Sequence, residues 1–153
     1  MDIYLDSPQR FNNLCAMVRT LEVFGFSRCF VHDPNRLVRG QYGRRRRREA
    51  QTISAGSFAR VELIRIEDPS QWLASWSGRI VATTPAPQAI SLPDFQFHDT
   101  DLIAFGGESH GLPPWLLAQS TAQITIPQHG QTNSLNVSVA VGVVLYSAIQ
   151  HIG

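Results

Sequence analysis

The sequence contains no lysine, so all 13 of its basic residues are arginines. Residues 1–65 hold 12 of them against 6 acidic residues, whereas residues 66–153 hold one against 6, within an overall net charge of +1. A basic first half indicates a polyanionic partner, and the planar guanidinium group of arginine can bind phosphate through two hydrogen bonds. The run of five arginines at 44–48 is therefore a candidate phosphate-binding segment. The alternatives are a solvated helix face and a disordered loop.

The residues from which metal sites and disulfide frameworks are built are few. Cys15 and Cys29 do not form a C-x-x-C pair, and the five histidines have no partners at metal-ligand spacing. This pattern indicates neither a zinc site nor a disulfide framework. We therefore expect a protein without a bound metal.

Long apolar runs are missing as well. The apolar stretch Val137–Ile149 is shorter than the roughly 20 residues needed to cross a bilayer, and Ser138, Gly142 and Ser147 interrupt it. The first residues are acidic where a signal peptide would be basic, and no apolar core follows them. We expect a cytoplasmic protein with no membrane anchor.

Short β-like runs alternate with helical patterns along the chain. Brief apolar runs between turn signals predict strands at 2–5, 28–31, 61–64, 79–83, 101–105 and 122–126. Apolar spacing predicts a helix over 11–24, a short helix that begins after Asp68 and includes Trp72 and Trp76, and a last helix from about Ser134 to Ile149. This alternation predicts an α/β fold in one domain, with a mostly parallel open sheet and helices on its faces.

The last helix is predicted to be apolar on nearly every face. One side carries Val137, Val141, Val144, Leu145 and Ala148, and the other carries Val139, Val143 and Tyr146. One side is expected to pack on the sheet, and the other needs a cover of its own. In a chain of this size a second copy is the natural source, so we expect a homodimer.

Three segments place polar residues and glycines where an ordinary core would not. The first, residues 13–20, carries Asn13 and Arg19 six positions apart, so the two need not share a helix face. The alternative for Arg19 is a surface arginine on an amphipathic helix.

The second segment, residues 105–113, is glycine-rich and directly follows a predicted strand. Glycines at the carboxyl end of a strand let a ligand approach the backbone, the alternative being an ordinary tight turn.

The third segment, residues 124–140, carries the most information. Pro127 and Gly130 break a strand, a polar loop follows, and then Ser134, Asn136 and Ser138 crowd the start of the apolar helix. One such residue would suffice as an N-cap. The additional Ser and Asn residues lower the helix propensity of this segment. Residues that destabilise local structure in this way often belong to a functional site.

In this order the segments resemble the three motifs of the SpoU/TrmH family of RNA ribose methyltransferases. The matching patterns are N-x-x-x-x-x-R-T, G-x-E-x-x-G-L and I-P-x-x-G-x-x-x-S-L-N-V-S-x-A, and the resemblance covers residues 3–149. Weaker matches lie at 54–56 and 81–84. The chain departs from the family at Cys15, Gly107 and Gln128, and none of these departures removes a polar catalytic group.

The resemblance implies one SPOUT-type methyltransferase domain over residues 1–153, with a deep C-terminal trefoil knot. It implies S-adenosylmethionine as cofactor and no metal. By matching positions, the implied cofactor contacts are Ala82, Thr83, Gly106, Glu108, Ile126, Ser134 and Leu135.

The implied reaction is attack of an RNA ribose 2′-oxygen on the methyl carbon of the cofactor. Arg19 matches the catalytic arginine of the family. Because a guanidinium group does not deprotonate in proteins, we expect Arg19 to bind the neighbouring phosphate, orient the ribose and stabilise the developing alkoxide. Ser134 and Asn136 would position the oxygen, and Glu108 would orient the loop backbone or Arg19. In a dimer, Arg19 could serve the pocket of the partner.

The expected substrate is tRNA, bound through Arg19, Arg45, Arg46 and Arg47. The small size of the chain resembles the subgroup that acts on the anticodon wobble ribose, and many rRNA-directed relatives carry an additional RNA-binding domain. The alternatives are an rRNA 2′-O-methyltransferase, an enzyme that methylates something other than RNA, and a non-catalytic RNA-binding module on the same fold. The presence of Arg19, Ser134 and Asn136 favours the enzyme.

Overall fold

The structure is a computed structural model that describes residues 1–38 and 44–151, except for the side chains of residues 44–47 and 49. Within these residues seven strands form one sheet in the order β3-β2-β1-β6-β4-β7-β5. The strands are β1 (Asp2–Asp6), β2 (Arg28–His32), β3 (Glu62–Arg65), β4 (Ile80–Thr83), β5 (Ile90–Ser91), β6 (Leu102–Phe105) and β7 (Ala122–Thr125). All the paired strands are parallel. Their carboxyl ends therefore lie at one edge of the sheet.

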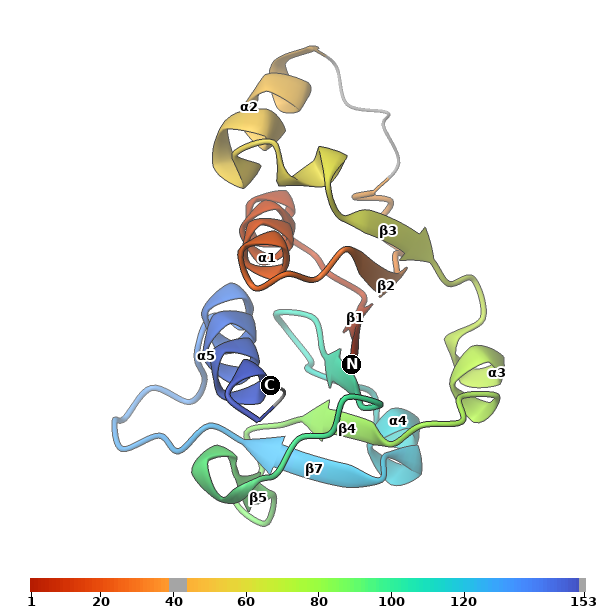
Figure 1. The fold of residues 1–153 in the computed structure, drawn as a ribbon. Helices are drawn as coiled ribbons and strands as arrows, with labels where there is room; N and C mark the ends of the chain where they lie inside the picture. The colour runs from red at the N-terminus through yellow and green to blue at the C-terminus, as the bar shows by residue number, and fades with distance from the viewer. Residues whose placement is uncertain (39–43, 152–153) are drawn as a thin grey trace.

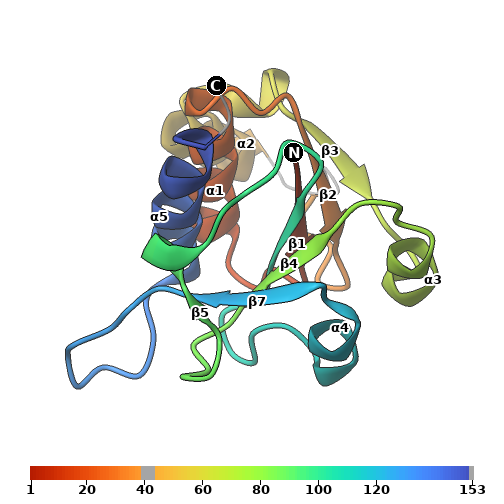
Figure 2. The same cartoon turned by 60° about the horizontal axis from the view of Figure 1, so that its bottom comes forward.

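Helices cover both faces of the sheet (Figures 1 and 2). One face carries α1 (Phe11–Val23) and α5 (Val137–Ile149), with α2 (Arg44–Ser54) packed on α1. The other face carries α3 (Pro69–Ala74) and α4 (Pro114–Gln119). Two single turns of 3-10 helix, at Ser57–Ala59 and Leu92–Asp94, complete the described elements.

The sheet has a separate hydrophobic core on each face. Because successive side chains of a strand point to opposite faces, Ile3 and Leu5 of β1 join the core beneath α1 and α5, while Tyr4 between them joins the core beneath α3 and α4. All three side chains are 2% exposed or less. Burial on both faces explains why the strands are continuously apolar rather than alternating.

The six strands expected from the sequence are all present, with ends that agree to within one residue. The helix over 11–24 is confirmed as α1, and Asp68 is confirmed as the N-cap of α3, where its side chain accepts a hydrogen bond from the backbone N–H of Gln71 at 3.0 Å. β5 and α4 were not predicted, because two residues and a single proline-led turn are too short to show a period. α3 ends at Ala74, so the expected extension through Trp76 was wrong.

The start of the last helix is also a correction. We expected it near Ser134, but α5 begins at Val137, and the Asn136 side chain caps it by accepting from the backbone N–H of Ser138 at 2.8 Å. Ser134 therefore lies in the loop before the helix. The segment between β7 and α5 remains irregular because its polar residues line a cavity rather than continue the helix.

The two-sided character of α5 is confirmed. Val141, Val144, Leu145 and Ala148 are at most 1% exposed and belong to the core, whereas Val139, Val143 and Tyr146 are 49%, 39% and 60% exposed. The described chain thus leaves an apolar helix face open to solvent.

Neither the strand order nor the pairing tests the trefoil knot that the resemblance implies, and the knot stays a prediction. Among the described helices, none has the length and apolar character needed to cross a membrane. No group of three or more potential metal ligands occurs among the described residues.

Candidate active site

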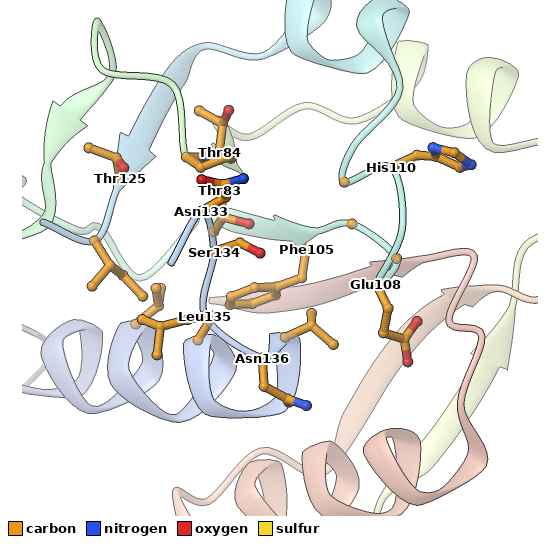
Figure 3. A pocket seen from close by; sticks show the side chains of 18 of the residues that line it. Thr83, Thr84, Phe105, Glu108, His110, Thr125, Asn133, Ser134, Leu135 and Asn136 are labelled. Atoms are coloured by element: carbon orange, nitrogen blue, oxygen red, sulfur yellow. The ribbon is translucent and has the colours of Figure 1, made fainter. Parts of the chain in front are cut away.

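A cavity of about 660 Å³ opens at the carboxyl edge of the sheet, between the ends of β4, β6 and β7 and the starts of α1 and α5. Its walls come from all three sequence motifs and from the loop after β4. The residues that line it include Arg10, Asn13, Thr83, Thr84, Phe105, Gly106, Glu108, Thr125, Ile126, Gln128, Asn133, Ser134, Leu135, Asn136 and Ala140. Figure 3 shows Thr83 and Thr84 from the end of β4, and Ser134 and Leu135 from the loop before α5, around the ring of Phe105. The volume is within the range typical of small-molecule and cofactor sites.

Glu108 joins the loop after β6 to the start of α1. Its Oε2 accepts from the backbone N–H of Gln9 at 2.8 Å, and its Oε1 accepts from the backbone N–H of Arg10 at 3.0 Å and from the side-chain amide of Asn13 at 2.9 Å. A second link runs parallel, because the Gln9 side-chain oxygen accepts from the Ser109 backbone N–H at 3.1 Å and from its hydroxyl at 2.7 Å. The second motif therefore fixes where the first helix begins.

The protonation of Glu108 reflects these contacts. Partial burial by itself raises the pKa of the carboxyl group, but the hydrogen bonds from Asn13 and from backbone N–H groups stabilise the charged form and outweigh it. The net result is a pKa below the ordinary value of glutamate. Glu108 is therefore an ionised acceptor at neutral pH, not a proton donor.

Asn13 and Asn136 connect the first motif to the third. The Asn136 side-chain N–H donates to the side-chain oxygen Oδ1 of Asn13 at 3.3 Å. The Asn136 Oδ1 accepts from the Ser138 backbone N–H at 2.8 Å and from the Ser138 hydroxyl at 2.6 Å. Each amide is thus oriented by two partners. A chain of hydrogen bonds from Glu108 through Asn13 to Asn136 holds the three motifs in one arrangement.

Two glycines shape the loop after β6. A Cβ atom at Gly106 would lie 2.0 Å from the carbonyl carbon of Gly111 and 2.2 Å from the backbone nitrogen of Leu112. Gly111 has a φ of 64°, in the left-handed region, and its N–H donates to the Gly107 carbonyl at 3.1 Å. The sequence left two reasons open for these glycines, close approach of a ligand and an ordinary tight turn. At Gly106 the structure supports the tight turn, because the loop's own returning backbone fills the space.

Gly107 is one of the departures from the family pattern. A Cβ atom there would lie 2.6 Å from the carbonyl oxygen of Ser7, which follows β1 and has a φ of 51°. The loop after β6 therefore packs directly on the end of β1. Any residue with a Cβ atom at this position would require this backbone to shift.

Most of the residues expected to bind the cofactor line the cavity. Thr83, Gly106, Glu108, Ile126, Ser134 and Leu135 all do so. Ala82, expected as a further contact, is fully buried in β4 and is not part of the lining. The expected catalytic residues Ser134 and Asn136 also lie in the wall, within the loop and cap that precede α5.

The apolar part of this lining suits an adenosine-containing cofactor. Phe105, Ile126 and Leu135 offer flat or branched apolar surface for a purine ring, and the hydroxyl groups of Thr83, Thr84 and Ser134 lie beside them. The Thr83 hydroxyl already donates to the Ala104 carbonyl at 2.9 Å, so its oxygen is oriented as an acceptor. An apolar slot with a few placed polar groups is typical of such sites.

Arg19 lies outside this cavity. It lines a second hollow of about 550 Å³ between α1 and α5, together with Val23, Phe24, Val139, Val143 and Tyr146. Its guanidinium donates to the carbonyl of Ile53 near the end of α2 at 3.4 Å. The catalytic residue expected from the first motif is thus separated from the other two, Ser134 and Asn136, within one chain.

The expected RNA-binding residues Arg45, Arg46 and Arg47 belong to α2, but their side chains fall outside what the structure describes. Thr84, Phe105 and Thr125 lie within candidate segments but were not named as individual contacts. They follow or end buried strands, and the rule that α/β sheets bind ligands at strand carboxyl ends could have singled them out. Arg10 gave no sequence signal.

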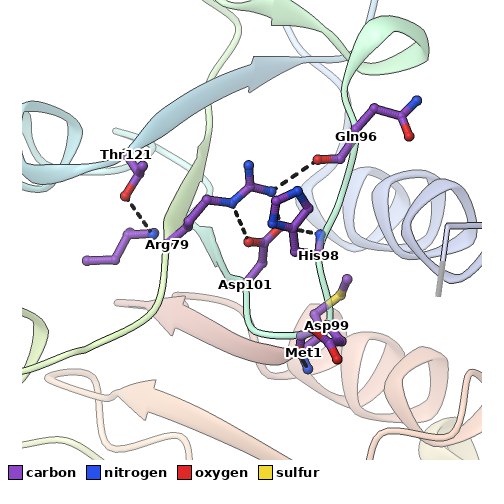
Figure 4. A network of polar contacts seen from close by, with 8 residues as sticks. Met1, Arg79, Gln96, His98, Asp99, Asp101 and Thr121 are labelled. Carbon is purple, nitrogen blue, oxygen red and sulfur yellow. Dashed lines mark hydrogen bonds and ion pairs between the residues drawn. The ribbon is translucent and has the colours of Figure 1, made fainter.

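The opposite edge of the sheet holds a polar network of a different kind (Figure 4). Asp101, which is fully buried, accepts two hydrogen bonds from Arg79 at 2.7 and 2.8 Å and one from the backbone N–H of His98 at 2.8 Å. Arg79 also donates to the carbonyl of Gln96 at 3.1 Å. This network ties β4 to the start of β6, and it lies away from the cavity at the amino ends of both strands.

Comparisons with known proteins agree with this architecture. The profile of the SpoU rRNA Methylase family matches residues 1–146. The chain is 27% identical to the tRNA (guanosine(18)-2′-O)-methyltransferase of Aquifex aeolicus over 95% of its own length and 67% of that protein. It is 28% identical to the 23S rRNA (guanosine-2′-O-)-methyltransferase of Acinetobacter baylyi over 94% of its own length and 57% of that protein. The chain therefore spans roughly three fifths of the length of these curated relatives.

Solved structures share the fold. The Aquifex aeolicus TrmH/SpoU tRNA modifying enzyme superposes with a TM-score of 0.84 at 24% identity, over 98% of this chain and 74% of that one. A structure described as giving insight into the 2-OH methylation of C/U34 on tRNA superposes with a TM-score of 0.83 at 26% identity, over 99% of this chain and 95% of that one. The α/β fold with its parallel sheet is confirmed, and the chain belongs to the SpoU rRNA methylase family.

Proposed function

We propose that the protein transfers a methyl group from S-adenosylmethionine to a ribose 2′-hydroxyl of tRNA. The observation that carries this proposal is the hydrogen-bonded chain Glu108–Asn13–Asn136, which brings three family motifs to one cavity at the carboxyl edge of the sheet. Relatives named as tRNA and rRNA 2′-O-methyltransferases support it. The match with the C/U34 structure over nearly the full length of both chains favours tRNA, and it supports a single domain over residues 1–153. A tRNA substrate places the reaction in the cytoplasm.

Thr83, Gly106, Ile126, Ser134 and Leu135 would hold S-adenosylmethionine on the apolar side of the cavity, and Ala82 would shape the site from within β4. The cofactor supplies an electrophilic methyl group. Phe105 closes the floor between the strand ends and α5 and excludes water from that side.

The chemistry is a displacement without a metal. A bond forms between the ribose 2′-oxygen and the methyl carbon, the bond from that carbon to sulfur breaks, S-adenosylhomocysteine leaves, and the hydroxyl proton passes to solvent. Ser134 and Asn136 orient the oxygen from the loop and cap before α5. Glu108, ionised and engaged on both oxygens, holds Asn13 in place and takes no proton.

Arg19 completes the site from a second copy of the chain. In its own chain it lies in the hollow between α1 and α5, apart from the cavity, on the face where Val139, Val143 and Tyr146 are exposed. A homodimer through this face buries the apolar residues and brings Arg19 to the partner's cavity, where it binds the phosphate beside the target ribose.

Co-expression of two differently tagged inactive variants tests this arrangement. Arg19→Ala removes the guanidinium, and Asn136→Asp keeps an oxygen that caps α5 but removes the donor to Asn13. If Arg19 acts in the partner's cavity, a dimer purified through both tags has one complete site and regains up to half of the wild-type activity. If Arg19 acts in its own chain, neither site is complete and the mixed dimer stays inactive.

Arg45, Arg46 and Arg47 bind the RNA backbone from α2. Their replacement by alanine is expected to weaken RNA binding and to lower the dependence of log Kd on log salt concentration by about one for each phosphate that is no longer bound. Cofactor affinity should not change. An unchanged salt dependence would contradict this role.

The function itself is tested by incubating the purified protein with total cellular RNA and S-adenosylmethionine carrying a labelled methyl group. Nuclease mapping is expected to locate the label on a ribose 2′-oxygen of tRNA. Label on rRNA instead would support the rRNA enzyme. Cofactor binding without transfer to any RNA would support the non-catalytic RNA-binding module.

A further inference from the structure

Arg10 is a second arginine at the candidate active site, and neither the motifs nor the resemblance pointed to it. It immediately precedes α1, lines the same cavity as Asn13, Glu108 and Asn136, and is exposed to solvent. Arg19, by contrast, lines the separate hollow between α1 and α5. Within one chain, Arg10 is thus the arginine found in the wall of the cavity.

The backbone of Arg10 is held on both sides. Its N–H donates to Glu108 Oε1 at 3.0 Å, and its carbonyl accepts from the backbone N–H of Leu14 at 3.1 Å as the first turn of α1 closes. The base of the side chain is therefore fixed to the loop after β6 and to the helix. Its guanidinium, on a flexible stem, can reach a ligand at the opening of the cavity.

The charge of Arg10 is available to a ligand. Other described arginines form ion pairs at 2.7 to 2.9 Å, among them Arg28 with Asp2, Arg60 with Glu22, Arg65 with Glu67 and Arg79 with Asp101. In the part of the chain that the structure describes, Arg10 has no ion pair and no side-chain hydrogen bond. Glu108, the carboxylate in the same wall, already accepts hydrogen bonds on both oxygens.

We propose that Arg10 is a positioning residue that binds an RNA phosphate next to the target ribose, in the cavity of its own chain. This inference rests on the proposed function. A ribose that enters the cavity brings its flanking phosphates to the opening, where Arg10 is exposed. The positive end of the α1 dipole lies beside it and favours an anion at the same place. A guanidinium group can bind phosphate through two parallel hydrogen bonds.

Three variants test this role: Arg10→Ala, Arg10→Lys and Arg28→Ala. Arg28 has the same charge but lies at the amino end of β2, at the opposite edge of the sheet, where it pairs with Asp2. The methyl-transfer rate is measured against tRNA concentration at several salt concentrations, and cofactor affinity is measured by titration calorimetry with S-adenosylmethionine.

Arg10→Ala is expected to raise KM for tRNA about tenfold and to lower the slope of log KM against log salt by about one, with kcat changed much less. Arg10→Lys keeps the charge and is expected to recover the salt slope and part of the affinity. Arg28→Ala should match the wild type in KM and salt slope. A loss of folding alone would reduce the active fraction but would not change the salt slope.

Two outcomes would overturn the proposal. If Arg10→Ala keeps the KM and salt slope of the wild type, Arg10 does not bind the RNA backbone. If it weakens cofactor binding and leaves KM for tRNA unchanged, Arg10 binds the cofactor carboxylate instead. Failure of the proposed function itself is distinguishable, because the wild type would then transfer no methyl group to RNA at all.

Discussion

Replacing Glu108 with glutamine tests whether its carboxylate holds the two walls of the cavity together. The carboxylate accepts from three N–H groups, two in the backbone of Gln9 and Arg10 and one in the side chain of Asn13. A glutamine side chain has nearly the same shape but has one acceptor oxygen and one NH₂ group. In either orientation the NH₂ faces at least one of these donors, so at least one hydrogen bond is broken and a donor is left opposed.

The magnitude follows from these hydrogen bonds. A hydrogen bond to a charged group contributes about 1.5–3 kcal/mol, and the partial exposure of Glu108 favours the lower end of this range. We therefore expect Glu108→Gln to lower the free energy of unfolding by about 2 kcal/mol. For a chain of this length that corresponds to a fall in Tm of about 4–8 °C. Methyl transfer should fall further, because Asn13 and Asn136 lose the group that orients them.

The pH dependence identifies the cause. Because the pKa of Glu108 is lower in the folded protein than in the unfolded chain, ionised Glu108 stabilises the fold above the ordinary glutamate value of about 4.3. That stabilisation is lost as the pH falls through the folded-state pKa. The difference in Tm between the wild type and Glu108→Gln should therefore be constant near neutral pH and should shrink below about pH 4.5.

Thermal unfolding followed by circular dichroism from about pH 7 to about pH 3.5 measures this difference. Glu62→Gln is the matched control, since Glu62 is exposed on β3 and its replacement should leave Tm nearly unchanged. Equal Tm values for the wild type and Glu108→Gln at pH 7 would refute the role of the carboxylate. A difference that persists unchanged at low pH would show that shape rather than charge matters.

Three further changes have defined outcomes. Arg79→Ala leaves the buried Asp101 without its ion pair and should cost about 3 kcal/mol in chemical denaturation, whereas Arg28→Ala at the surface should leave the denaturation midpoint nearly unchanged. Gly106→Ala inserts a methyl group into space that the loop backbone occupies. Calorimetry should show a destabilisation of at least about 2 kcal/mol together with weaker cofactor binding. A variant as stable as the wild type would contradict the loop geometry. Asn136→Ala removes the cap of α5 and should cost about 1 kcal/mol, which Asn136→Asp should restore without restoring methyl transfer.

Six of the seven described strands and helices α1, α3 and α5 could be predicted from the sequence because their signals are local. Burial on both faces makes the strands apolar, Asp68 and Pro69 mark the start of α3, and Gly25 follows the end of α1. The resemblance of the three motifs to those of the SpoU/TrmH family likewise indicated a methyltransferase. Where the prediction was wrong, at the start of α5, the polar residues had been assigned to the helix although only Asn136 caps it.

The arrangement of the site depends on the tertiary structure. Glu108 and Asn13 are 95 positions apart, and Asn136 and Asn13 are 123 apart, so their contacts follow from strand register and loop closure rather than from any local pattern. The same holds for Thr84, Phe105 and Thr125, which meet only because parallel strands end at one edge.

By itself, then, the sequence determined the fold class, six of the seven described strands, helices α1, α3 and α5, and the motifs, because periodicity and capping act over a few residues. Arg19 belongs to α1 and Arg10 immediately precedes it. Only the tertiary structure decided that Arg19 lies outside the cavity of its own chain while Arg10 lines that cavity. The reason is the rotation of the helix: Arg10 and Arg19 are nine positions apart, about two and a half helical turns, so the start of α1 faces the loop after β6 while Arg19 faces the hollow beside α5. That rotation separates the two arginines and makes a second copy of the chain part of the proposed mechanism.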